Sequence, residues 1–386
     1  MDTCLRKPSS LESFYIDLDT CGCNMTFHYF LQLDRRPSLR LLNRTLRKLL
    51  TTTHREINLK FRELAWHLSD YISPVRVEET KDDDVCNSRP PRLDFLKHTL
   101  ALNVLHNRQD QWFLRFDFFH GAVDGRSGIQ FIYDFFAALN GKDPRNGEFT
   151  RMDSDLVPVK QEQANKKLPI PCWPVHKLKS GLISGKGVDR TQLVRTMACT
   201  KSMAAKLSNA VASCFRERAK MIIPVDVRRY SQDKKPLFGN LIVPIFVDAN
   251  TNRRIEDLRT EILSYVKDSS LLSAGLNSLS FYSRIKPSLR VAILRKLIPL
   301  VMASKKFICC ALVSPVGEVK SDKLICPAFS VRDVIVSFVS FPFTAFTVAS
   351  VQFDDHTNTT VSWHSGRVSP EVADNLIRSI DENLHT

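Results

Sequence analysis

One segment of this sequence has neither a strand-like nor a helix-like hydrophobic period. On both sides of it, the two periods alternate along the chain. Residues 150–190 are rich in proline and lysine and keep no periodicity. Because the alternation on both sides lacks a strict strand–helix–strand rhythm, it predicts mixed sheets with helices packed on them. We therefore expect a two-lobed α/β (α+β) sandwich, with residues 1–150 as an N-terminal lobe, 151–190 as a linker and 191–386 as a C-terminal lobe.

The N-terminal half contains the clearest local pattern. Residues 100–104 and 112–118 each alternate between apolar and other side chains, and a turn-like tetrad at 107–110 separates them. This arrangement predicts a hairpin with one strongly apolar face. Ser127 and Gln130 have the spacing of a capping box, which predicts a helix from about Gly128 to the Asn-Gly pair at 140–141.

Chemistry is expected where the second strand of this hairpin ends. His120 continues the apolar parity of Phe116 and Phe118, so it is predicted to be the last residue on the buried strand face. Asp124 and Gly125 follow before the helix, giving the pattern HxxxDG. A core histidine with an aspartate in a turn is the structural alternative, and the pattern alone does not decide between the two interpretations.

The chain is basic, with 55 Lys and Arg against 41 Asp and Glu and a net charge of +14. Such a balance suits a phosphate-bearing ligand, a nucleic acid or an anionic membrane surface. The basic stretches at 35–62 and 283–306 match no nucleic-acid motif, so we expect no nucleic-acid partner. The basic amphipathic helix expected at 288–302 leaves peripheral membrane contact open as an alternative.

Other classes of site find little support. The ten cysteines form no CxxC pair and no Cys/His set with zinc spacing, so no metal site is expected. The first residues contain no apolar signal-peptide core, and we expect a cytoplasmic protein with reduced thiols. The uncharged stretch 334–353 is rich in Val, Phe and Thr, which predicts strands rather than a membrane span.

Four sequence segments together resemble the CoA-dependent acyltransferase superfamily, which includes chloramphenicol acetyltransferase, condensation domains and alcohol acetyltransferases. These segments are FHGAVDG at 119–125, PVDVRR at 224–229, LFGNLIVP at 237–244 and VSPVGEV at 313–319. The resemblance implies two chloramphenicol-acetyltransferase-like lobes with a tunnel between them. It also implies an acyl-CoA-dependent acyltransferase whose acceptor is a small alcohol or amine and which needs no cofactor beyond that co-substrate.

The resemblance further implies roles for particular residues. His120 would be the general base, and Asp124 would hold the loop by pairing with a basic residue, for which Lys60, Arg62 and Arg228 are candidates. Gly125 would leave room at the tunnel, and Gly239 and Asn240 would lie near the site on the second lobe.

The sequence departs from the family pattern in two respects that keep alternatives open. Phe119 occupies the first histidine position of condensation domains, and the passage 201–221 is shorter than the helical segment that relatives usually have there. One alternative is a stand-alone condensation-like protein that uses carrier-bound acyl thioesters. The other is a binding or assembly protein on an acyltransferase fold that has lost activity.

Overall fold

The computed structural model describes most of the chain. The described residues are 4–81, 85–87, 92–144, 148–149, 151–157, 178, 187–196, 201–216, 218–232, 235–269, 271–272, 276, 282–304, 306–338 and 340–385. Most of the linker expected at 151–190 lies outside these ranges.

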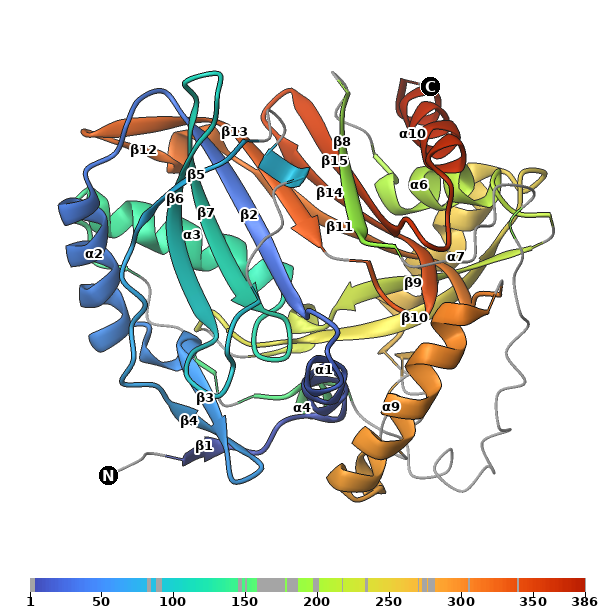
Figure 1. Ribbon diagram of the computed structural model, residues 1–386, viewed down its shortest axis with the longest axis horizontal. Helices are drawn as coiled ribbons and strands as arrows, with labels where there is room; N and C mark the ends of the chain where they lie inside the picture. The colour runs from blue at the N-terminus through green and yellow to red at the C-terminus, as the bar shows by residue number, and fades with distance from the viewer. Residues whose placement is uncertain are drawn as a thin grey trace.

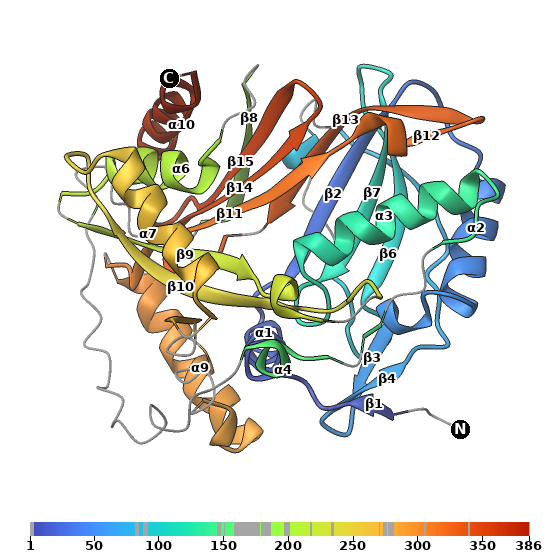
Figure 2. The same ribbon diagram turned by 180° about the vertical axis from the view of Figure 1, so that it is seen from behind.

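A six-stranded sheet forms the N-terminal lobe (Figure 1). Its spatial order is β12 (Ile325–Cys326), β13 (Phe329–Phe338), β2 (Thr26–Leu33), β7 (Trp112–Phe119), β6 (Leu100–His106) and β5 (Val77–Glu79). All neighbouring pairs are antiparallel except β5 with β6. Helices α2 (Leu39–Thr51) and α3 (Gly125–Leu139) pack against each other, and Figure 2 shows α3 lying across the sheet. The predicted hairpin is β6–β7.

A second six-stranded sheet forms the other lobe. Its order is β10 (Ile242–Ala249), β9 (Ala219–Asp226), β11 (Cys309–Val319), β14 (Thr344–Phe353), β15 (His356–His364) and β8 (Asp189–Thr196). The sheet is mixed, because β11 runs parallel to both β9 and β14 while the remaining pairs are antiparallel. Helices α6 (Met203–Ala212), α7 (Ile255–Lys267) and α10 (Pro370–His385) pack on it.

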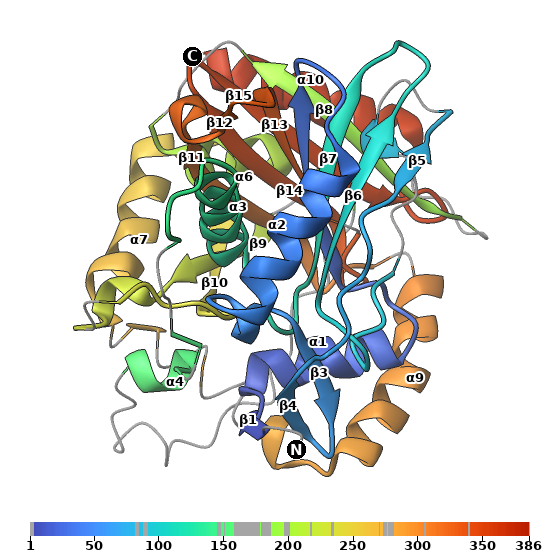
Figure 3. The same cartoon turned by 90° about the vertical axis from the view of Figure 1, so that its left-hand side faces the viewer.

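The remaining elements lie mainly at one end of the molecule. A small sheet is formed by β1 (Cys4–Arg6), β4 (Ala65–Leu68) and β3 (Leu59–Arg62). Helices α1 (Ser10–Thr20) and α9 (Pro287–Ala303) contact each other, as Figures 1 and 3 show, and α4 (Asp153–Leu156) is short. The described residues also include four 3-10 turns: η1 (Arg55–Ile57), η2 (Val85–Asn87), η3 (Arg228–Tyr230) and η4 (Ser321–Lys323).

A segment from the C-terminal half of the chain joins the N-terminal sheet. Strand β13 pairs with β2 from Val331 to Phe338, so residues 325–338 extend the N-terminal sheet, whereas the sequence assigned all of 191–386 to the C-terminal lobe. This segment is tied to the other sheet by Asp333 on β13, which contacts Arg195, His356 and Asn358 on the strands β8 and β15. Sequence pattern identifies a strand here but cannot assign its partner, because pairing depends on contacts remote in the chain.

The two-lobed fold class expected from the sequence is confirmed, with two mixed sheets of six strands and packed helices. Strand β9 begins at Ala219, seven residues after α6 ends at Ala212, so the short passage noted in the sequence is a short connection in the fold. Helix α1 was not predicted from the sequence. Its signal is the capping box of Ser9 and Glu12, in which each side chain accepts from the other residue's backbone N–H.

Candidate active site between the lobes

His120 lies at the end of β7, where the chain leaves the N-terminal sheet. Its backbone N–H donates to the carbonyl of Met25 at 2.8 Å, which extends the β2–β7 pairing by one residue. The imidazole stacks on the Tyr15 ring of α1, with centroids 4.5 Å apart and planes 12° apart. Phe27 and Phe338 contact the same ring, with centroids at 5.2 and 5.6 Å. The predicted strand parity thus turns His120 toward the space between the lobes.

A small cavity of about 30 Å³ adjoins the imidazole. Both lobes and α1 line it, through Leu11, Tyr15, His120, Ile222, Pro224, Ile242, Pro244, Leu312, Ser314 and Phe338. Among the lining residues, Tyr15, His120 and Ser314 carry polar side chains, and the other side chains are apolar. A volume of this size corresponds to about one water molecule, so side chains must move before a substrate can enter.

Burial determines the charge states of the His120 imidazole and the Tyr15 phenol. Burial lowers the pKa of His120 to about 4, although the Asp124 charge and the nearby carbonyls of His120 and Val123 oppose that shift. The imidazole is therefore neutral at pH 7 and can accept a proton. Burial, assisted by Asp124, raises the pKa of the Tyr15 phenol, which consequently stays protonated and can donate a hydrogen bond.

Asp124 is 1% exposed and acts as the N-cap of α3. Its Oδ1 accepts the Ser127 N–H at 2.8 Å, and its Oδ2 accepts the Leu241 N–H of the other lobe at 2.8 Å. The helix begins at Gly125, so the cap is Asp124 and not the Ser127 that the capping-box spacing suggested. An aspartate side chain satisfies a first-turn N–H that the helix itself leaves open, which explains the difference.

Arg228 is the basic residue that contacts Asp124. Its Nη1 lies 2.9 Å from Oδ2, and its Nη2 donates to Oδ1 at 3.1 Å. The other two candidates lie elsewhere, since Lys60 is 3.9 Å from Asp70 and Arg62 is 3.4 Å from Glu63. The ion pair joins the start of α3 to η3 and thereby connects the two lobes close to the loop that follows His120.

Gly239 and Asn240 complete this connection. Gly239 has a φ of +126°, a conformation that favours glycine, and its carbonyl accepts the Asp124 N–H, the Ser127 hydroxyl and Arg228 Nη2. Asn240 donates from Nδ2 to the His120 carbonyl at 2.6 Å. Both residues hold the backbone around His120, and neither is part of the cavity lining.

Gly125 was expected to leave room at a tunnel, and the structure places it against the neighbouring strand β11. A Cβ at this position would lie 2.9 Å from Val316 Cγ1. The Gly125 carbonyl also accepts the Tyr29 hydroxyl at 2.7 Å. The missing side chain therefore allows the first turn of α3 to approach the other sheet closely.

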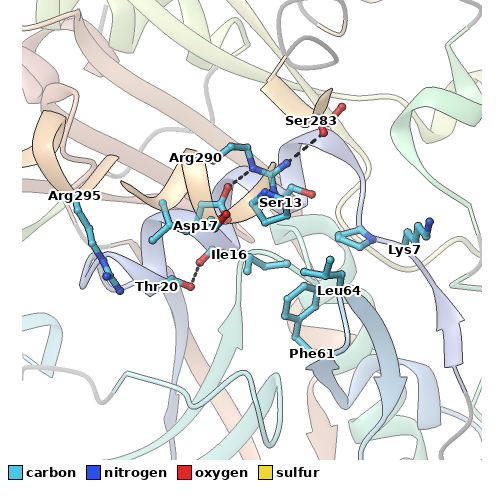
Figure 4. Close-up of a pocket in the computed structure, with 14 residues that line it drawn as sticks. Lys7, Ser13, Ile16, Asp17, Thr20, Phe61, Leu64, Ser283, Arg290 and Arg295 are labelled. Atoms are coloured by element: carbon cyan, nitrogen blue, oxygen red, sulfur yellow. Dashed lines mark hydrogen bonds and ion pairs between the residues drawn. The ribbon is translucent and has the colours of Figure 1, made fainter. Parts of the chain in front are cut away.

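A larger pocket of about 630 Å³ lies beside α1 (Figure 4). The face of α1 that lines it is opposite Leu11 and Tyr15, which line the His120 cavity. The pocket lining includes the basic residues Lys7, Arg290 and Arg295 together with Asp17 of α1. Arg290 Nε donates to Asp17 Oδ2 at 2.7 Å. Helix α1 thus separates a basic pocket from the His120 cavity, and its residues contribute to both linings.

The described residues contain neither a cluster of side chains suited to a metal ion nor a helix suited to crossing a membrane. Among them, no group of three or more His, Cys, Asp or Glu side chains is arranged to hold a metal ion. Within the same part of the chain, no helix has both the length and the apolar composition needed to cross a membrane.

Solved structures share this arrangement of lobes. A trichothecene 15-O-acetyltransferase from Fusarium sporotrichioides matches with a TM-score of 0.63 and 10% identity, over 98% of this chain and 94% of that one. A starter condensation domain of rhizomide synthetase in complex with C8-CoA matches with a TM-score of 0.63 and 11% identity, over 100% and 95%. The chain has the fold of the CoA-dependent acyltransferases and condensation domains. No family model and no curated protein matches the sequence.

The same fold also occurs in a domain whose structure was solved in complex with a second protein. The X-domain from teicoplanin biosynthesis, solved in complex with OxyB, matches with a TM-score of 0.57 and 11% identity, over 98% of this chain and 92% of that one. At such identities the likeness concerns the fold alone, and activity has to be argued from the residues of this chain.

Of the three polar residues that line the cavity, the sequence pointed to His120 and not to Tyr15 or Ser314. Tyr15 lies on α1, which was not predicted, and the capping box of Ser9 and Glu12 was the available signal. Ser314 lies within the VSPVGEV segment, but no pattern in the sequence indicates that β11 passes beside His120.

Proposed function

We propose that this protein is an acyltransferase that moves an acyl group from acyl-CoA to the hydroxyl or amine of a small acceptor. The observation that carries the proposal is a neutral imidazole, His120, in a cavity bounded by both lobes. A thioester is already activated, so the reaction requires a base and an oxyanion donor and no covalent nucleophile.

The chemistry assigns a role to each polar side chain of the cavity. His120 Nδ1 is buried, which leaves Nε2 to take the proton as the acceptor oxygen or nitrogen attacks the thioester carbonyl. The tetrahedral intermediate then breaks its C–S bond, and the imidazolium returns the proton to the leaving thiolate. Ser314 and Tyr15 line the same cavity, and their hydroxyls are candidates to donate hydrogen bonds to the oxyanion.

The basic pocket supports CoA as the donor. Its volume of about 630 Å³ falls within the usual range for ligand sites, and Lys7 and Arg295 offer positive charge to phosphate groups. Leu11 and Tyr15 of α1 line the His120 cavity, whereas Ser13 and Asp17 of the same helix line the pocket. Because α1 lies between the pocket and the cavity, the proposal requires this helix, and Tyr15 with it, to move so that a thioester arm held in the pocket reaches His120. The donor can also be a carrier-bound thioester, because its phosphopantetheine arm carries the same thioester and a phosphate.

A non-catalytic binding protein is the second candidate, and the small cavity favours it. At about 30 Å³ the cavity excludes a substrate in this conformation, and Tyr15 covers one face of the imidazole. A fold that has lost activity would tolerate such closure, whereas an enzyme must open it in every turnover.

A thiol-release screen separates these candidates. Purified protein is incubated with acyl-CoAs of different chain length and with pooled alcohols and amines, and free thiol and acylated product are both measured. The proposal predicts product formation that depends on both substrates and on His120. Absence of product with every CoA and with carrier-bound acyl groups, in protein that is folded by its melting curve, would favour the binding role.

A further inference from the structure

Helix α9 exposes a line of large apolar side chains. Leu289, Ile293 and Leu300 are 53%, 47% and 68% exposed, and the neighbouring Leu297 is 38% exposed. Leu289, Ile293, Lys296 and Leu300 are separated by four, three and four residues. This spacing places their side chains on one face of a helix. Figures 1 and 2 show α9 on the outside of the molecule.

The opposite face of α9 is packed in the ordinary way. Arg290, Leu294 and Ile298 are buried there, and α9 contacts α1 along this side. The helix is therefore apolar on both its inner and its outer face. Packing within the chain explains the inner face, but it does not explain why leucine and isoleucine occupy the outer one.

The charged residues of α9 and of the segments directly flanking it have a single sign. Residues 283–306 contain no Asp or Glu, and the exposed residues there include Arg284, Lys286, Lys296 and Lys306. Exposed apolar side chains surrounded by Lys and Arg are the pattern of helices that lie in the interface of an anionic membrane. A second copy of the chain is a poor occupant, because a two-fold contact would place these basic residues against each other.

Helix α2 provides an internal comparison. It also carries an exposed basic face, formed by Arg40, Arg44, Arg47 and Lys48, but none of its leucines is exposed. Leu42, Leu46, Leu49 and Leu50 are buried, and Leu39 and Leu41 are half-buried. The basic character of the chain therefore does not by itself bring apolar residues to the surface. The apolar line is particular to α9 when these two basic helices are compared.

We propose that the outer face of α9 docks on an anionic lipid surface, with Leu289, Ile293 and Leu300 inserted at the level of the headgroups and Lys296 near lipid phosphates. The helix would lie in the plane of the membrane. The proposal stands on the exposure and charge of α9 and does not depend on any catalytic role of His120.

Vesicle co-sedimentation tests the proposal. Vesicles of phosphatidylcholine alone are compared with vesicles that also contain phosphatidylserine, at low and at physiological salt. We expect binding to the anionic vesicles that weakens with salt, and little binding to the neutral ones. The triple variant Leu289→Ser, Ile293→Ser, Leu300→Ser should bind at least tenfold more weakly with an unchanged melting temperature, because these side chains are exposed.

A matched pair of double variants tests whether the charge acts at α9. Arg284→Gln with Lys296→Gln should weaken binding by roughly 25-fold, since each basic residue near the surface contributes about fivefold. Arg40→Gln with Arg44→Gln removes the same charge from α2 and should change binding by less than about twofold if α2 does not face the membrane.

Three results would overturn the proposal. These are unchanged vesicle binding by the triple variant, equal losses in the α9 and α2 charge variants, and a lipid-independent dimer that the triple variant abolishes. The last result would identify a second copy of the chain as the occupant of this face.

Discussion

Replacing Asp124 by alanine removes a carboxylate that four groups share. Its oxygens accept the Ser127 and Leu241 N–H groups, both at 2.8 Å, and both Nη atoms of Arg228, at 2.9 and 3.1 Å. The variant therefore loses the cap of α3 and a buried contact between the lobes. We expect it to lower stability and activity together, because both depend on the position of the loop that follows His120.

The size of the effect follows from these contacts. Loss of an N-cap costs about 0.5–2 kcal/mol, and removal of one partner from a buried ion pair costs about 3–5 kcal/mol. The two terms share one carboxylate and do not add. In the variant, Arg228 still contacts Asp226 at 3.0 Å and the carbonyls of Leu237 and Gly239. These remaining contacts favour the lower end of the range of about 3–5 kcal/mol. We expect a loss of about 3 kcal/mol, or about 4 °C in melting temperature if the 386 residues unfold as one unit.

Asp226→Asn is the matched control. Asp226 contacts the same arginine, but its side chain is 34% exposed, and pairs that are partly screened by solvent contribute about 1 kcal/mol or less. Melting curves and turnover are measured for both variants and the wild type. If Asp124→Ala melts within about 2 °C of the wild type while turnover is lost, Asp124 acts in the chemistry and the structural assignment is wrong.

Three further predictions follow from burial and backbone geometry. Because the pKa of His120 is lowered to about 4, kcat/KM should stay level from pH 9 to about 5 and fall only near pH 4. A fall in kcat/KM already near pH 6.5 would mean that the imidazole is not desolvated. Burial, assisted by Glu12, raises the pKa of Asp153 from 3.8 to about 7, so the folded form keeps its proton longer and stability declines as the pH rises between these values. Asp153→Asn should therefore gain melting temperature over the wild type at pH 8 but not at pH 4, and an equal difference at both pH values would contradict this. Gly239→Ala should cost about 1–3 kcal/mol in chemical denaturation through its φ of +126° alone, since the added Cβ would meet no atom closer than 3.6 Å; an unchanged midpoint would show that the loop relaxes freely.

Local pattern predicted the parts of the site that lie on regular elements. The alternation along residues 112–118 placed His120 at the end of a buried strand, and β7 ends at Phe119. The PVDVRR segment offered Arg228 as one of three partners for Asp124, and the structure selects it. These predictions depend on neighbours within one strand or one motif, which a single sequence records.

Features that depend on remote contacts could not be predicted. Strand β13 joins the N-terminal sheet through β2, some 300 residues earlier in the chain, and no local period encodes that partner. The same holds for the stacking of Tyr15 on His120 and for the arrival of Ser314 at the cavity. The volume of the cavity depends on how these side chains pack, which residue spacing does not determine.

The most direct test of the central claim compares acyl transfer by two histidine variants. His120→Ala removes the imidazole that lines the cavity, whereas His106→Ala removes a surface imidazole that contacts Glu79 and Asp110. With an acyl-CoA and acceptor pair identified in the screen, kcat/KM should fall by roughly 10²–10⁴ in His120→Ala and stay within about twofold in His106→Ala. Equal acyl transfer by His120→Ala and the wild type would contradict the account and remove His120 from the mechanism.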